Sequence, residues 1–559
     1  MLRLATTTLR ASRLRHASTS SRPPLRGRRI ALGSGLVLTT LLTSKIYADS
    51  AAITLSSTSK EEPRSQSPLG TLVRSYVVYT MCSMPALVDN APWLLETLTS
   101  IPGVRWITEA IVRVTFFDQF VGGDTAEKTL PLLQRLRQNN TGTLFAYSVE
   151  VDEAEAMAAG SSSADRNPHR EIVKEMIHCI DIAADFEQTV GAKETGRRTW
   201  VAVKITALLP DASALIRLSK HILTIRPPTT APHVAFPGNP TVSDLDVIYA
   251  PSPTGDLTPS DLSMLRTLHA DLEAICTRAQ ERGVRIIIDA EYSWYQPALD
   301  ALALALMRRF NALDTGSTQP LVYATYQAYL RRTPAHLFHA LHDAKKHGFA
   351  LGVKLVRGAY HTHESAAHPD PASSSTASSA KGKSLSISPD VLPPVWSVKH
   401  DTDATYNACA SLLLDAVAAD IQSAPPGSAP RVGVLFGTHN WASAEGILEG
   451  LEDRGLVVRV PSEKEKEGRL VVKEQLGERV TFGQLYGMCD DLTETLANRL
   501  DSNAPMVIKY IPYGALSEVM PYLSRRAIEN KSVLGPDGGA AKRERDRAWG
   551  LIWDRLFGG

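Results

Sequence analysis

Eight short β-rich runs, each followed by a longer segment of helical periodicity, set the strongest limit on what this chain can fold into. The runs are LFAYSVEV (144–151), WVAVKITAL (200–208), RIIIDAEYS (285–293), LVYATYQAYL (321–330), GVKLVRGAY (352–360), VGVLFGTHN (432–440), VTFGQLYGM (480–488) and VIKYIPYG (507–514). Their near-continuous apolar character is typical of parallel strands that are buried on both faces. Eight strand-helix units predict an α/β fold, the (β/α)8 barrel, in which the chemistry lies at the carboxyl ends of the strands.

The composition narrows the class of protein further. The chain has 559 residues, 43% of them apolar, with 60 Lys and Arg against 59 Asp and Glu. This balance is typical of a soluble enzyme and argues against a disordered chain or a nucleic-acid-binding protein. Five cysteines lie far apart and never form a CxxC pair, which argues against both a disulfide framework and a zinc cluster.

The first 48 residues contain eight Arg, one Lys and many Ser and Thr, but no Asp or Glu. This composition predicts a mitochondrial transit peptide, and a disordered basic tail is the alternative interpretation. A charge-free stretch, residues 30–44, is shorter than the roughly 20 residues that cross a bilayer. We interpret it either as a membrane-proximal segment or as part of the cleaved leader.

The pattern of polar, apolar and helical residues along the chain predicts four further segments. They are a polar linker (49–68), an N-terminal helical arm (69–140), the catalytic barrel (141–535) and a C-terminal tail (536–559). Two insertions, 210–257 and 365–394, are rich in Pro, Thr or Ser and are predicted to be mobile loops.

Polar side chains gather at the predicted strand ends and should converge on the mouth of the barrel. They are Lys204, Asp289, Glu291, Gln327, Lys354, Arg357, His439, Asn440, Gln484 and Tyr510. A charge inside an apolar strand is costly unless it is paired. Lys204 and Lys354 should therefore point into the barrel, either toward a ligand or into a structural ion pair with Asp289 or Glu291.

The segment SEVMPYLSRRAIEN (517–530) follows the last strand and has helical spacing. Tyr522, Arg526 and Glu529 share one face of this helix. If the helix crosses the mouth of the barrel, Arg525 and Arg526 can hold a small carboxylate between two guanidinium groups. The alternative is that both are solvated surface charges.

Histidines offer weaker signals. His361 and His363 form an HxH pair without a third ligand, so a solvated loop is favoured over a metal site and we expect no metal. His439, at a strand end, either faces a cofactor or serves as a polar cap.

Four motifs in order, GVKLVRGAY, FGTHN, GQLYGM and YLSRRAIEN, resemble the proline dehydrogenase family. The resemblance covers roughly residues 115–535. It implies oxidation of L-proline to Δ1-pyrroline-5-carboxylate, with hydride passing to a noncovalent FAD and electrons then to the respiratory quinone pool. It also implies the first step of proline catabolism, on the matrix side of mitochondria and in association with the inner membrane.

The resemblance also implies roles for individual residues. Asp289 and Lys354 would be catalytic, with Lys354 beside the flavin and Asp289 orienting the arginines. The residues implied to bind substrate are Lys204, Leu485, Tyr510, Tyr522, Arg525 and Arg526. Those implied to bind FAD are Gln327, Val356, Arg357, Gly358, Thr438, His439 and Asn440. The phenol of Tyr510 would leave little space for a ring hydroxyl, which favours proline over hydroxyproline.

One departure from the family pattern lies near the site: Cys489 stands where glycine is common. Two alternatives stay open, hydroxyproline oxidation by the same machinery and a catalytically silent mitochondrial barrel. The charged residues predicted at the mouth argue against the silent barrel, because a scaffold has no need of them.

Overall fold

The computed structural model describes nine stretches of the chain, namely residues 68–148, 168–192, 196–226, 234–313, 320–368, 385–425, 428–461, 468–532 and 539–557. The chain divides into two compact units, Met1–Leu72 and Val73–Gly559. Of the first unit, only residues 68–72 are described, and they include the start of helix α2 (Leu69–Cys82). The predicted transit peptide, the apolar stretch at 30–44 and nearly all of the linker lie outside the described residues.

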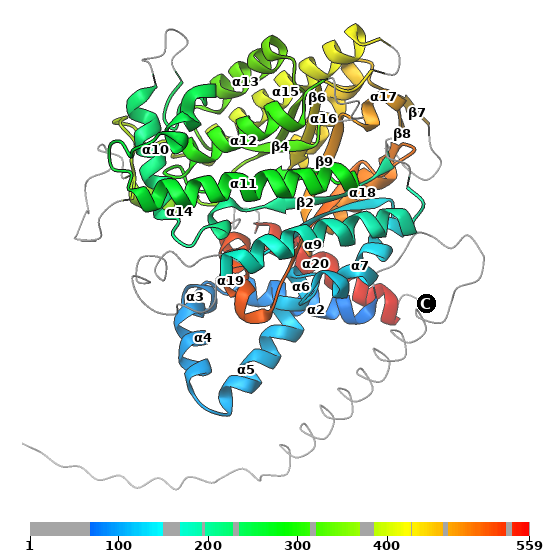
Figure 1. The fold of residues 1–559 in the computed structure, drawn as a ribbon. Coiled ribbons are helices and arrows are strands. Elements are labelled where there is room, and N and C mark those ends of the chain that lie inside the picture. Colours follow the sequence, from blue (N-terminus) through cyan, green and yellow to red (C-terminus); the bar gives the residue numbers. More distant parts are fainter. Residues whose placement is uncertain are drawn as a thin grey trace, which may run out of the picture. The chain divides into compact units, whose positions relative to one another are not determined.

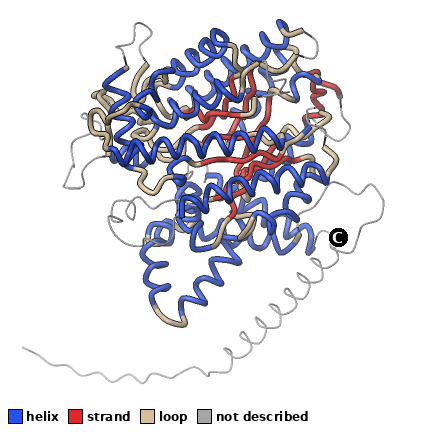
Figure 2. The backbone as a smooth tube through the Cα atoms, in the orientation of Figure 1, coloured by secondary structure: helices blue, strands red, loops and turns tan. Residues whose placement is uncertain are grey.

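Eight parallel strands of the second unit close into a barrel, in the order β1-β11-β9-β6-β5-β4-β3-β2. The strands are β1 (Thr141–Tyr147), β2 (Thr199–Val203), β3 (Ile286–Ile288), β4 (Val322–Gln327), β5 (Leu351–Val356), β6 (Val432–Gly437), β9 (Val480–Leu485) and β11 (Val507–Tyr513). Figure 2 shows these strands in red, surrounded by helices. Each strand overlaps one of the eight predicted runs, so the predicted barrel is confirmed.

Burial on both faces explains the apolar runs. All five residues of β2 are buried. Trp200 and Tyr323 point into the barrel, where their ring centroids lie 5.2 Å apart. Val201 and Ile286 belong instead to the core between the strands and the outer helices. Each strand therefore serves two apolar cores, which removes the usual alternation of polar and apolar residues.

The outer helices alternate with the strands (Figure 1). They are α7 (Ala126–Gln138), α9 (Pro168–Thr189), α11 (Pro259–Arg282), α12 (Gln296–Phe310), α13 (Thr333–His347), α15 (Lys399–Ser423), α16 (Trp441–Asp453) and α18 (Asp490–Arg499). Helix α11 shows how the sequence sets such boundaries. Thr258 and Asp261 form a capping box at its start, and Gly283 ends it in the left-handed conformation, at φ 67°.

The insertion at 210–257 corrects the prediction of a mobile loop. It contains helix α10 (Ser213–Ile225) and the 3-10 helix η4 (Val242–Tyr249). Leu215, Leu218 and Ile222 are spaced for one helical face and are buried, so α10 packs into the outer core. In the second insertion, α14 (His361–Ala367) runs into its first residues, and 385–394 are described as irregular chain. Its residues 369–384 lie outside the described part.

Between residue 68, where the described part begins, and β1, the chain is mostly helical. The helices are α2, α3 (Pro85–Asp89), α4 (Ala91–Ser100), α5 (Val104–Val112), the π-helical turn η1 (Arg113–Phe117) and α6 (Asp118–Phe120). Within the described residues, no helix combines the length and the hydropathy needed to cross a membrane.

The prediction did not include a small three-stranded sheet or the helix at the C-terminal end of the described residues. A small sheet of β7 (Val457–Val460), β8 (Arg469–Val472) and β10 (Leu500–Asp501) lies between β6 and the last strand in the sequence. After β11 comes the predicted final helix, α19 (Leu516–Ser532). The segment described only as a tail forms helix α20 (Gly539–Phe557), which buries Ala541, Ala548 and Ile552.

Candidate active site

Three strands bring together a partly buried cluster at the mouth of the barrel. Asp289 follows β3, Lys354 lies in β5 and Tyr510 lies in β11. Lys354 Nζ lies 2.6 Å from Asp289 Oδ1, and the Tyr510 hydroxyl donates to Asp289 Oδ2 at 3.0 Å. Lys354 Nζ also lies 5.1 Å from the centre of the Tyr510 ring. Of the two predicted partners for Lys354, the structure therefore selects Asp289.

Next to this cluster, Gln327 ends β4 with one polar atom unused. Its amide Nε2 donates to the carbonyl oxygen of Glu291 and to the Tyr329 hydroxyl, both at 3.2 Å. Its Oε1 is buried and accepts no hydrogen bond from the described residues. A buried carbonyl without a donor costs free energy, so this oxygen marks a place where a ligand can donate.

Lys204 and Glu291 form an electrostatic pair after β2 and β3. Burial raises the pKa of the Glu291 carboxyl, while hydrogen bonds from Thr206 and the charge of Lys204 oppose that rise. The Thr206 backbone N–H donates to Glu291 Oε1 at 3.1 Å, and the Thr206 hydroxyl donates to Oε2 at 2.5 Å. Glu291 therefore fixes the loop that follows β2, which also carries Lys204.

Arg357 links β5 to two outer helices. Its guanidinium donates to Asp403 at 2.6 Å and to the hydroxyls of Thr438 and Ser443, both at 2.8 Å, and it stacks on Tyr406. Because these contacts engage all three guanidinium nitrogens, Arg357 acts in the structure as a brace for the turn after β5.

The residues beside Arg357 complete that turn. The carbonyl of Val356 accepts from the Ala328 N–H at 2.8 Å, which ties β5 to the end of β4. Gly358 has φ +125°, and a Cβ there would lie 2.6 Å from the Tyr329 ring. Only glycine fits such a close approach at this backbone angle.

The segment after β6 is held by its own side chains. Asn440 caps α16 by accepting from the Ser443 N–H, and its own N–H donates to the Thr438 hydroxyl at 3.0 Å. His439 Nε2 accepts from the Leu485 N–H at 2.9 Å. Burial, followed by the charges of Lys509 and Arg526, lowers the pKa of His439 to about 3. The ring is therefore neutral at physiological pH and carries its proton on Nδ1.

Helix α19 reaches over the strand ends. The Arg525 guanidinium lies 5.2 Å from the ring of Tyr360, which follows β5. Arg526 is buried, pairs with Glu529 at 2.5 Å and stacks on Tyr522 at 5.0 Å. The predicted capping helix is confirmed, and it brings two guanidinium groups to the mouth of the barrel.

Sequence reasoning missed Lys509, which also lies at this mouth. It is buried in β11, donates to the carbonyl of Met488 at 2.7 Å and pairs with Asp490 at 2.8 Å. The signal was present, since Lys509 interrupts the apolar run VIKYIPYG as Lys354 interrupts its own strand. Gln484, which the strand-end pattern did include, bonds the carbonyl of Thr438 and the hydroxyl of Thr493 and so serves the frame of the barrel.

Leu485 and Cys489 flank the same turn. Leu485 ends β9 and packs with the apolar cluster that contains Tyr522. Cys489 adopts the left-handed conformation, at φ +50°, which favours glycine. This backbone angle is a physical reason to expect glycine at this position.

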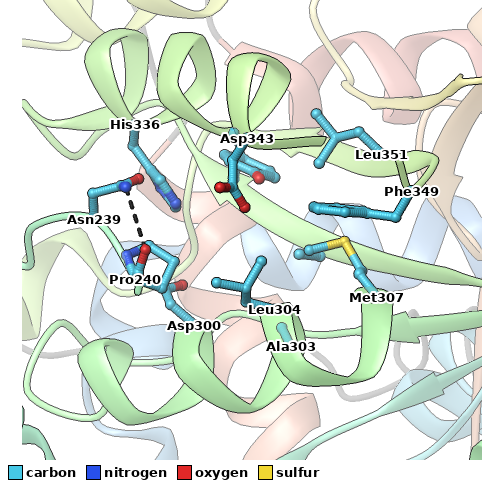
Figure 3. A pocket seen from close by; sticks show the side chains of 13 residues that line it. Asn239, Pro240, Asp300, Ala303, Leu304, Met307, His336, Asp343, Phe349 and Leu351 are labelled. Carbon is cyan, nitrogen blue, oxygen red and sulfur yellow. Dashed lines mark hydrogen bonds between the residues drawn. The ribbon is translucent and has the colours of Figure 1, made fainter. Parts of the chain in front are cut away.

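A small cavity elsewhere is lined by both apolar and polar side chains (Figure 3). It lies between α12 and α13, against the outward-facing side of β4, with Leu304, Met307 and Phe349 around it. Both of its acidic residues lie close to basic side chains: Asp300 pairs with Arg332 at 2.6 Å, and Asp343 lies 3.3 Å from His347. We therefore place the site at the mouth, where partly used polar groups converge. No cluster of ligands that could hold a metal ion occurs among the described residues.

Comparison with known proteins shows which family the chain belongs to. The family model described as "Proline dehydrogenase" matches residues 131–378 and 388–536. Hydroxyproline dehydrogenase of Rattus norvegicus is 28% identical over 492 residues, which cover 87% of this chain and 91% of the relative. Proline dehydrogenase 1, mitochondrial, of Arabidopsis thaliana is 30% identical over 478 residues, which cover 84% of this chain and 80% of the relative.

Among solved structures, proline utilization A of Bdellovibrio bacteriovorus is similar in fold. Its TM-score is 0.52 at 17% sequence identity, over 88% of this chain. This chain spans 40% of the length of that protein. The closed barrel of eight parallel strands and this likeness define the fold class as a (β/α)8 barrel. The chain belongs to the proline dehydrogenase family and is a dehydrogenase.

Proposed function

We propose that this protein oxidises L-proline to Δ1-pyrroline-5-carboxylate with FAD as cofactor. The observation that carries the proposal is the partly buried cluster of Asp289, Lys354 and Tyr510. It lies at a mouth that α19 crosses with Arg525 and Arg526. Two guanidinium groups suit a small carboxylate, since each can donate in a bidentate manner. The charge of Lys204, on the loop after β2, adds to that attraction.

The residues at the mouth fit a flavin in two respects. The unpartnered Gln327 Oε1 can accept a hydrogen bond from the ring system, and the Gly358 turn lets the backbone approach closely. In this proposal Val356, Thr438, His439 and Asn440 line the cofactor, while Arg357 braces the turn that holds it. When bound, FAD supplies the acceptor for the hydride that leaves C5 of the proline ring.

The chain's own residues orient the substrate and set the electrostatics. Arg525 and Arg526 fix the carboxylate, and Leu485, Tyr510 and Tyr522 enclose the ring. Lys354 places a positive charge where negative charge develops, and Asp289 holds both Lys354 and the Tyr510 hydroxyl in place. The Nε2 atom of His439 already accepts from Leu485, so it is not available as a base.

We further propose a mitochondrial location on the matrix side of the inner membrane, with a quinone as the electron acceptor. The acid-free leader and the mitochondrial names of the Arabidopsis and Drosophila relatives support this location. Transfer to a lipid-soluble acceptor would place the protein at the membrane. The oxidation of proline would there be the first step of proline catabolism.

Hydroxyproline oxidation is the second candidate. Hydroxyproline dehydrogenases from rat and mouse match at 28% and 29% identity, which is close to the match with proline dehydrogenases. Against it, the Tyr510 hydroxyl is held by Asp289, so the phenol keeps a fixed place beside the ring that it would contact.

An anaerobic absorbance titration tests both candidates and the silent barrel. The purified protein should be yellow, and L-proline should bleach the flavin band, whereas trans-4-hydroxy-L-proline should bleach it far less. Arg525→Met and Arg526→Met should each abolish bleaching by proline while flavin stays bound. Arg309→Met, an exposed arginine of α12, is the matched control and should bleach normally.

Three outcomes would contradict the proposal. Bleaching by hydroxyproline alone would assign the second candidate. A colourless protein that takes up no added FAD would contradict the enzyme assignment and favour the alternative of a catalytically silent barrel. Normal bleaching in both arginine variants would show that Arg525 and Arg526 do not bind the substrate carboxylate.

A further inference from the structure

The α4–α5 hairpin carries an exposed apolar face that no described element covers. We call it the hairpin patch and define it as Ile101, Trp106, Ile107, Ile111 and Val114. Their exposed fractions are 45%, 76%, 53%, 52% and 60%. Soluble proteins seldom expose so many large apolar side chains in one place unless they bind something there.

Helical geometry puts the patch on one side. At 100° per residue, Trp106, Ile107, Ile111 and Val114 fall within one arc of α5 and η1. Thr108, on the opposite side of α5, is buried. The charges that border the arc are paired with each other, Arg105 with Glu109 and Arg113 with Asp124. The patch itself therefore carries no charge.

The hairpin projects from the rest of the second unit, as Figure 1 shows for α4 and α5. A projecting apolar helix can enter a fluid surface without a complementary hollow in its partner. Tryptophan at its exposed edge is typical of segments that sit at the boundary between lipid headgroups and acyl chains.

The size of the patch disfavours a second copy of the chain as its partner. Even if each side chain had the roughly 250 Å² of a large aromatic residue, the exposed fractions would give less than the about 800 Å² that each partner buries in a standard interface. Insertion into a bilayer needs no such minimum, because it depends on apolar side chains that leave water.

A groove connects the patch with the capping helix. It runs between α4, α5 and the start of α19, and Trp106, Val112, Leu516 and Met520 are among the residues that line it. The same helix α19 carries Arg525 and Arg526 over the mouth of the barrel. A lipid-soluble molecule that leaves the bilayer at the hairpin would thus meet a groove beside the helix that covers the site. Arg105, Glu109 and Arg113 line this groove together with its apolar side chains.

We propose that the hairpin patch inserts into the surface of a lipid bilayer and so docks the barrel mouth beside the membrane. The docking surface rests on the exposed side chains alone. Its use for delivery of a quinone rests on the proposed function.

Flotation with phosphatidylcholine vesicles, with and without phosphatidylglycerol, measures the docking without turnover. The double variant Trp106→Asp and Ile111→Asp should weaken vesicle binding at least about tenfold, because carboxylates are costly in the bilayer. Trp106→Phe should bind nearly as the parent does. Phe338→Asp, which changes an exposed aromatic residue of α13, is the matched control and should leave binding unchanged.

Each variant is made in the full chain and again in a chain without residues 1–48, so that binding by the basic leader is separated from binding by the hairpin. Brominated lipid should quench the fluorescence of the parent more than that of Trp106→Phe. Proline oxidation with a water-soluble dye should be equal in all variants. If the dye assay fails in every protein, the proposed function is wrong while the vesicle result still stands.

Three results would overturn the docking proposal. One is unchanged vesicle binding in the double variant. Another is a change in the sedimentation coefficient of the double variant without lipid, which would assign the patch to a second copy of the chain. The third concerns helix α20, which also exposes aromatic side chains. If Trp553→Asp abolishes vesicle binding while the double variant in the hairpin patch does not, α20 is the docking element.

Discussion

The two ends of the barrel contain similar charged residues but use them differently. At the amino ends of the strands, both Glu187 oxygens are occupied by Arg137, the Arg198 backbone and the Thr199 hydroxyl. Arg198 is fully buried, bonds the carbonyl of Pro505 and pairs with Glu478. At the carboxyl ends, Gln327 keeps a buried oxygen without a donor and Asp289 holds two groups that face the mouth.

This difference separates structural charge from functional charge. At the amino ends of the strands, which we call the closed end of the barrel, hydrogen bonds and the Arg137 charge outweigh burial and lower the pKa of Glu187. At the mouth, burial prevails and raises the pKa of Glu291. A network whose acceptors are all occupied stabilises the fold, whereas a network that keeps free capacity is ready for a ligand.

The largest effect is expected at the closed end. Arg198→Met should lower the free energy of unfolding by about 3–5 kcal/mol, because it leaves the carbonyls of Pro505 and Gly477 without their donor and removes one of the two arginines that pair with Glu478. Urea denaturation measures the loss. Proline oxidation per folded molecule should stay unchanged, and a parallel loss of that activity would show that the two ends are not independent. The exposed pair of Arg309 is the control, where Arg309→Met should cost under about 1 kcal/mol.

At the mouth, Lys354→Met should affect activity more than stability. We expect kcat/KM for proline to fall about 100-fold, which corresponds to about 2.7 kcal/mol. Asp289 keeps its bond from Tyr510, so the unfolding free energy should fall by only about 1–3 kcal/mol. Steady-state kinetics and urea denaturation give the two values. Lys220→Met, on the exposed side of α10, should change neither.

The barrel could be predicted from sequence because its signal is local. Each strand is apolar along nearly its whole length, and that pattern does not depend on distant partners. Helix α10 was missed because the Pro-rich and Thr-rich stretch after it dominated the composition of the insertion. The strands β7, β8 and β10 are four residues or shorter, and α20 lies in a segment rich in charge. Such elements form because of tertiary contacts more than because of their own pattern.

The sequence predicted which residues lie at the candidate site, but it did not predict which of them contact each other. The strand-end rule selected Asp289, Lys354 and Tyr510, which the fold brings into contact. It could not tell that Lys354 would take Asp289 instead of Glu291, because that choice depends on the relative rotation of neighbouring strands. It also did not show that Arg357 would be fully engaged by Asp403, Thr438 and Ser443.

Tyr510→Phe should have a smaller effect, since it removes one hydrogen bond and keeps the ring. We expect the unfolding free energy to fall by about 0.5–1.5 kcal/mol and kcat/KM for proline to fall less than tenfold. Turnover of hydroxyproline should rise relative to proline, because the phenol no longer fills its position. Competition kinetics with both substrates measures this ratio. An unchanged ratio would show that Tyr510 does not contact that edge of the ring.

The smallest effect concerns Glu544 of α20. Burial raises the pKa of its carboxyl, as it does for Glu291. Burial, followed by the charges of Asp490 and Asp491, raises the pKa of Glu544 to about 8. Between the ordinary pKa of a glutamate and about 8, the folded protein holds this proton and the unfolded chain does not. Stability should therefore fall as pH rises through that window. Glu544→Gln should remove this part of the pH dependence and raise Tm at pH 8 by a few degrees. Thermal melts of both proteins from pH 5 to about 9 test the prediction, and parallel curves for the parent and the variant would contradict it.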